Sequence, residues 1–133
     1  MDCFINKDPK PIKNLLSEYI IKKYPDIDEQ IDKAFNFLDG EIVSYDEPFP
    51  SACGAREQKA YGSRTRHIIT DKSTEYKIAF KGWYSYDKEP KKVGITSIGI
   101  ENITMWNKLK SDNQLSDNNE DKWLLHIGYD YKD

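Results

Sequence analysis

The spacing of hydrophobic residues changes its period at Gly40, and this change constrains the fold more than any other feature of the sequence. Before Gly40, apolar residues recur every three to four positions, as on one face of an α-helix. After Gly40 they alternate with polar residues, as on a β-strand with one buried face. Helices followed by strands are typical of an α+β domain rather than of an alternating α/β domain.

The first part of the chain predicts two helices. One carries an apolar stripe of Ile12, Leu15, Leu16, Tyr19 and Ile20, with Pro11 in its first turn. The second spans residues 26–38, where Asp26 and Glu29 have the spacing of a capping box. Gly40 is expected to end this helix in the left-handed conformation.

The remainder predicts about five strands. They are expected at residues 41–45, 64–70, 75–84, 92–103 and 122–132, with a hairpin turn at 71–73. A phase shift between Ile95 and Ile98 predicts a β-bulge. The segments 46–63 and 105–121 are expected to be long loops, the second with one helical turn near residues 105–109.

Together these patterns predict one domain over residues 1–133, with two N-terminal helices packed on one face of a mostly antiparallel sheet. Trp123, Leu125 and Ile127 alternate on the apolar face of the last strand, which the helices should cover. Lys77, Lys81 and His126 then belong to the free face. Function is expected on this free face or in the two long loops.

The composition indicates the cellular compartment and limits the kinds of binding site that we expect. The N-terminal residues lack a basic start and an apolar run, and no stretch approaches about 18 apolar residues, so we expect a cytoplasmic protein without a membrane contact. Cys3 and Cys53 are expected to be free thiols. With His67 and His126 they show no metal-ligand spacing, and no phosphate-binding loop is present, so neither a metal nor a cofactor is expected.

Charge is unevenly distributed along the chain, whose net charge is −3. Residues 56–92 carry 10 basic and 5 acidic residues, whereas residues 1–55 carry 6 and 11. The basic residues are explained by a solvated hairpin face, or by an anion or RNA site at Arg64, Arg66 and His67. The acidic ends argue against general nucleic-acid binding.

The acidic residues offer a surface for a basic partner. This candidate set comprises Asp46, Glu47, Asp112, Asp117, Glu120 and Asp121. Trp83, Tyr84 and Tyr86 cluster at a hairpin end, where they serve packing or form an exposed binding patch.

An enzymatic alternative uses the two histidines. His67 and His126 could form an acid–base pair for RNA cleavage, with Arg64 or Arg66 stabilising phosphate charge. The order of helices and sheet resembles that of barnase-like and toxin-type ribonucleases. The alternative is that each histidine is a structural strand residue. Cys53, in a predicted loop, is either a nucleophile that needs a histidine base or an incidental cysteine.

The leading hypothesis is a non-catalytic protein-binding module. In size, acidity and architecture the chain resembles the immunity proteins that neutralise bacterial toxins, many of which cover a basic nuclease site with acidic patches. The resemblance implies a toxin domain as partner. The charged residues, 32% of the chain with both signs mixed, favour a monomer or small oligomer. The Lys-, Asn- and Ile-rich composition fits an AT-rich bacterial or phage genome.

Overall fold

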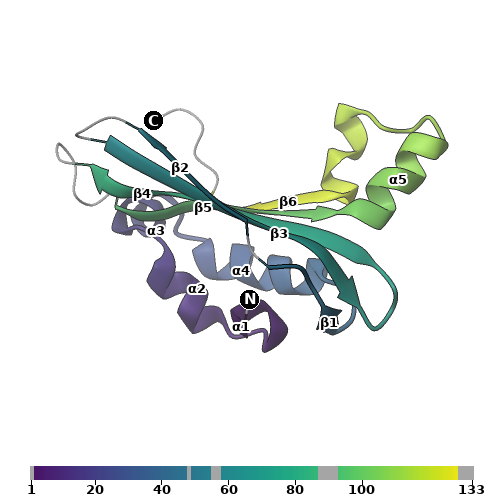
Figure 1. Cartoon of the computed structure of the whole chain (residues 1–133), viewed down its shortest axis with the longest axis horizontal. Helices are drawn as coiled ribbons and strands as arrows, with labels where there is room; N and C mark the ends of the chain where they lie inside the picture. The colour runs from purple at the N-terminus through teal and green to yellow at the C-terminus, as the bar shows by residue number, and fades with distance from the viewer. Residues whose placement is uncertain (1, 48, 55–57, 87–92, 129–133) are drawn as a thin grey trace.

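The computed structural model describes residues 2–47, 49–54, 58–86 and 93–128, and only the backbone at residues 2–3, 49–54, 58–61 and 84–86. These residues form an α+β structure in which helices α1–α4 cover one face of a twisted antiparallel sheet (Figure 1). Helix α5 lies on the opposite side of the sheet (Figure 1). The predicted fold class is therefore confirmed.

The first predicted helix is in fact broken into two. Helix α1 (Asp2–Ile5) is followed by α2 (Pro9–Leu15) and α3 (Glu18–Lys23). Leu16 is extended and forms a bridge with Ile95, and the Ser17 N–H donates to the Ile95 carbonyl at 2.9 Å. The Ser17 hydroxyl then accepts from the Ile20 N–H at 3.3 Å, which caps α3.

Helix α4 (Ile27–Phe37) is close to the predicted second helix. Its buried stripe consists of Ile27, Ile31, Ala34 and Phe35. The predicted capping box is wrong, because the Asp26 carboxylate makes no capping bond and accepts instead from the Gln30 amide at 3.1 Å. Gly40 has φ +94°, so its predicted left-handed conformation is confirmed.

Six strands of the described residues form one sheet. They are β1 (Ile42–Ser44), β2 (Phe49–Gly54), β3 (Gln58–Thr70), β4 (Glu75–Tyr86), β5 (Gly94–Asn102) and β6 (Leu124–Ile127). Their order is β1-β3-β4-β5-β6, and β2 also pairs with β3. All these strand pairings are antiparallel.

The predicted long loop at 46–63 is therefore wrong. Most of this segment belongs to β2 and to the beginning of β3, which pair from Phe49 opposite Arg64 to Gly54 opposite Lys59. Among the described strands, β2 pairs only with β3, so it is an edge strand. An edge strand tolerates Pro50, because proline has no N–H to donate and no second neighbouring strand requires that bond. The proline and glycine residues that suggested a loop are compatible with this position.

The register shifts at four places in the described sheet, and two of these shifts concern the candidate residues. In β5, Ser97 lies opposite Lys81 and Ile95 opposite Gly82, so Thr96 is the additional residue. This confirms the predicted bulge between Ile95 and Ile98. In β3, the register moves by three residues, from Thr65 to Ile68, while β4 moves by two. The residues at positions 66 and 67 therefore both lie opposite the residue at 77.

The core lies between the sheet and the first four helices. The sheet contributes Tyr76, Ile78, Ile98, Ile100 and Ile127, and the helices contribute Phe4, Ile12, Ile20, Ile31 and Phe35, among others. The rings of Phe4 and Phe35 meet edge to face at 6.1 Å between centroids. Ile127 and the half-buried Leu125 confirm the predicted apolar face of β6. The last part of the predicted strand, residues 129–132, lies outside the described residues.

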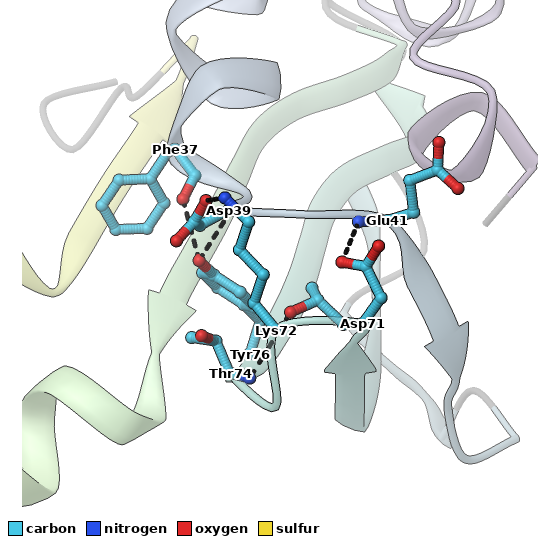
Figure 2. A network of polar contacts seen from close by, with 8 residues as sticks. Phe37, Asp39, Glu41, Asp71, Lys72, Thr74 and Tyr76 are labelled. Atoms are coloured by element: carbon cyan, nitrogen blue, oxygen red, sulfur yellow. Dashed lines mark hydrogen bonds and ion pairs between the residues drawn. The ribbon is translucent and has the colours of Figure 1, made fainter.

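A buried tyrosine joins the end of α4 to β4. The Tyr76 hydroxyl accepts from the Asp39 N–H at 2.9 Å and donates to the Phe37 carbonyl at 3.0 Å (Figure 2). Burial raises the pKa of this hydroxyl. Nearby, the Lys72 ammonium lies 2.9 Å from the Asp39 carboxylate, and the Asp71 carboxylate accepts from the Glu41 N–H at 3.0 Å. These bonds hold the helical layer to the β3–β4 turn.

The predicted loop at 105–121 contains helix α5 (Ile103–Ser111) and the 3-10 helix η2 (Asp117–Lys122). We call residues 103–122 the α5–η2 arm. The Asn102 side chain caps α5 by accepting from the Met105 N–H at 2.9 Å, and the Thr104 hydroxyl accepts from the Glu75 N–H at 2.9 Å. The arm is therefore attached to the ends of β4 and β5. None of the helices in the described ranges has the length and apolar character needed to cross a membrane.

Candidate functional site

The sheet face turned away from α1–α4 carries a hollow with a volume of about 300 Å³, which we call the sheet hollow. Its lining comes from four strands: Arg64; Lys77, Ala79 and Lys81; Ser97, Gly99 and Glu101; and Leu124 and His126. The sequence-predicted residues Lys77, Lys81 and His126 thus share the free face, as the alternation of the strands predicted.

The hollow results from one row of residues across the sheet. Arg64 lies opposite Ala79, Ala79 opposite Gly99, and Gly99 opposite His126. The two middle residues have almost no side chain, whereas the two outer residues are long or broad. A Cβ atom on Gly99 would lie 3.5 Å from Nδ1 and Cε1 of His126, so the imidazole lies directly beside this glycine. Ala79 and Gly99 therefore form the floor, and Arg64 and His126 form opposite walls.

The lining has a surplus of two positive charges, with three basic side chains and one carboxylate. The Lys77 ammonium lies 3.3 Å from the Glu101 carboxylate directly opposite in register, and each side chain is less than a third exposed. Within the described part of the chain, Arg64 and Lys81 make no ion pair. These two cations are therefore available to a ligand.

The environment of His126 keeps its imidazole neutral at neutral pH. Burial lowers the pKa of His126, the charge of Lys81 lowers it further, and the carboxylates of Glu120 and Glu101 partly oppose this change. A neutral imidazole has one N–H donor and one acceptor nitrogen. A neutral His126 adds no full charge to the lining of the hollow.

His67 belongs to a different environment, at the bulge of β3. Its φ is +52°, a left-handed conformation that is uncommon outside glycine, and Nδ1 lies 2.6 Å from the Asp46 carboxylate. The hydrogen bond and charge of Asp46 raise the pKa of His67. The Asp46 N–H also donates to the Arg66 carbonyl at 3.1 Å. His67 and Arg66 are not among the residues that line the hollow.

The structure does not bring the two histidines together. His67 is on β3 and His126 on β6, three strands away in the sheet. At a strand spacing of about 4.8 Å, their backbones lie about 14 Å apart across the sheet alone. An acid and a base that act on one phosphate must both reach its oxygens within hydrogen-bond distance. Of the predicted anion-site residues, only Arg64 and His126 share the hollow.

The acidic candidates occupy two separate places. Asp112 ends α5, and Asp117, Glu120 and Asp121 belong to η2. Asp46 and Glu47 follow β1, at the other end of the strand order. All six are exposed. The arm therefore gathers four of the six, with the 39% exposed Leu115 between α5 and η2.

The remaining candidates are described only in part. Trp83 is half-buried in β4, between Ala60 of β3 and Gly94 of β5. The side chains of Tyr84, Tyr86 and Cys53 lie outside the described part of the structure. The backbone of Cys53 belongs to strand β2 rather than to the predicted loop. No group of three potential metal ligands from His, Cys, Asp and Glu occurs among the described residues.

Sequence reasoning identified both walls of the hollow but not its floor. Ala79 and Gly99 are small residues on the polar face of their strands, each two positions from charged or polar residues, and this contrast was the available signal. Glu101 belongs to the same lining, and the sequence alone does not identify its partner. In the structure its neighbour across the strands is Lys77.

The fold and the hollow define an α+β domain whose antiparallel sheet is covered by helices on one face and carries a charged hollow on the other. The chain belongs to the family described as Domain of unknown function (DUF5104), whose model matches residues 1–121. The match covers the helical layer, five strands and most of the arm, whereas β6, with Leu124 and His126, follows it. No curated protein matches the chain.

Proposed function

We propose that this protein is a non-catalytic protein-binding module of the immunity type, which binds and neutralises a bacterial toxin domain. The observation that carries the proposal is the α5–η2 arm, whose helix α5 lies on the side of the sheet opposite α1–α4 (Figure 1). Its exposed acidic residues are Asp112, Asp117, Glu120 and Asp121. A basic toxin surface, such as that of a nuclease, is the complementary partner.

The arm has the features of a protein contact surface. Its four acidic side chains are exposed. Complementary charge on a basic partner would speed the encounter of the two proteins, and like charge would disfavour acidic competitors. The exposed Leu115 supplies an apolar group that a partner can cover. Leu109 is 4% exposed and anchors α5, while the Lys110 ammonium lies 5.0 Å from the Trp106 ring centre, a cation–π contact. Helix α5, which ends at Asp112, is therefore anchored, and η2 carries the other three acidic groups.

The alternative of an RNA-cleaving enzyme is supported less well by the geometry. It requires His67 and His126 to act on one phosphate, and three strand spacings separate them. His67 is also hydrogen-bonded to Asp46, at the other end of the strand order from β6. We therefore propose binding rather than catalysis.

The experiment begins with the gene neighbourhood, where an adjacent gene for a toxin domain is expected. The toxin domain is then produced with and without this protein, and growth, together with calorimetric affinity, is measured. We expect the triple variant Asp117→Lys, Glu120→Lys, Asp121→Lys to lose at least about 100-fold in affinity, which corresponds to about 2.8 kcal/mol, and to lose protection.

A matched control makes the same change of charge on the other face. Glu18→Lys, Glu29→Lys and Asp32→Lys alter three exposed acidic residues of α3 and α4. This variant should bind and protect almost as the parent protein does. Equal losses in both triple variants would show that only net charge matters. RNA cleavage that disappears in His67→Ala or His126→Ala would contradict the proposal.

A further inference from the structure

We propose that the sheet hollow is a binding site for a small organic dicarboxylate. This proposal does not rest on the proposed toxin contact, because the hollow and the arm use different side chains. The first observation behind it is the charge of the residues that line the hollow. Arg64 and Lys81 line the hollow without an ion pair in the described part of the chain, while Lys77 is already paired with Glu101. Two available cations match a ligand with two negative charges.

The shape of the hollow sets the size of the ligand. Its volume of about 300 Å³ lies at the lower limit of small-molecule pockets. It holds about ten water molecules at liquid density, or a ligand with a similar number of non-hydrogen atoms. Ala79 and Gly99 leave the floor open, and Leu124 supplies an apolar contact for a short carbon chain. A four- or five-carbon dicarboxylate has these dimensions.

The available donors favour carboxylate over phosphate. Protein sites for phosphate commonly use several backbone N–H groups from a glycine-rich loop or helix N-terminus. In this hollow, the floor belongs to β4 and β5, and each of these strands is paired on both sides in the sheet. The donors that remain are side chains. The planar fork of Arg64 matches a carboxylate in a bidentate geometry.

Binding is tested by NMR titration of the whole chain, with succinate as the probe. We expect saturable shifts of the Ala79, Gly99 and His126 signals. Succinamide, which has the same carbon chain without charge, should cause none. Acetate should bind at least about 10-fold more weakly because it offers one carboxylate to two cations. Inorganic phosphate should also bind more weakly than succinate.

Variants distinguish this hollow from general attraction to basic residues. Arg64→Gln should weaken succinate binding at least about 10-fold, since it removes a charge-assisted bidentate contact. Arg66→Gln is the matched control: Arg66 is exposed on the same strand but does not line the hollow, so the affinity should change less than 2-fold. Gly99→Val should abolish binding by filling the floor, with the amide spectrum confirming the fold.

Three results would overturn the proposal. The first is succinate shifts that grow linearly without saturation. The second is an equal loss in Arg64→Gln and Arg66→Gln, which would indicate diffuse attraction. The third is phosphate binding as tight as succinate binding. Arg64→Gln alters an exposed side chain, so it tests the site even if Gly99→Val fails to fold.

Discussion

Asp46 and His67 show how one carboxylate sets the behaviour of an exposed histidine. The carbonyl of Arg66, the residue before His67, accepts a hydrogen bond from the Asp46 N–H. Asp46 is therefore bonded to the bulge of β3 through both its backbone and its side chain. The raised pKa of His67 means that the folded state binds a proton more tightly than the unfolded state. The resulting stabilisation is fully present below the unfolded value of about 6.5 and is lost as pH rises through the folded pKa.

The first prediction concerns this pair. Asp46→Asn removes the charge that raises the pKa of His67, so this pKa should fall toward 6.5. NMR titration of the histidine ring signals measures the change. His126 serves as the internal control, because its pKa is lowered by burial and should stay where it is. An unchanged pKa of His67 would show that the pair does not form in solution.

A second prediction concerns Trp123. Its indole Nε1 is buried and has no hydrogen-bond acceptor among the described residues. An unsatisfied buried donor costs about 1–3 kcal/mol. Trp123→Phe removes that donor along with part of the ring, so the two effects should nearly cancel and stability should change by less than about 1 kcal/mol. Chemical denaturation measures this change, and a loss above about 3 kcal/mol would mean that the N–H has a partner.

At the scale of elements, the junction between α4 and β4 depends on one hydroxyl. Tyr76→Phe leaves the Asp39 N–H and the Phe37 carbonyl without their shared partner, and should lower the free energy of unfolding by about 1–3 kcal/mol. The matched control is Tyr45→Phe, measured by the same chemical denaturation. Tyr45 is 42% exposed, so this substitution should change the free energy of unfolding by less than about 0.5 kcal/mol. Equal effects of the two substitutions would exclude the junction in Figure 2.

Element boundaries were only partly predictable from the sequence. The stripe from Ile12 to Ile20 has helical spacing, but a bridge between Leu16 and Ile95 interrupts it. Ser17 followed by Glu18 was a local signal for a new helix start. No local signal identifies Ile95 as the partner, because that contact joins residues about eighty positions apart.

For the whole molecule, we predict a gradient of stability from the sheet to the arm. Strand β4 is paired on both sides and carries the fully buried Tyr76 and Ile78, whereas η2 has no buried residue. Native-state hydrogen exchange should therefore show the slowest exchange at amides of β4 and much faster exchange in η2. Equal protection of the two elements would mean that the arm unfolds only with the whole sheet.

The α+β class, helix α4, the β3–β4 hairpin and the buried face of each central strand could be predicted from the amino-acid sequence. These follow from periodicity, which is a local property of the chain. By contrast, the folded chain was needed to show that Arg64, Ala79, Gly99 and His126 form one row and that His67 lies outside it. The physical reason is register: a shift of one residue at any strand pair would move a residue to the other face, and the pairings and bulges that set the register join distant parts of the chain.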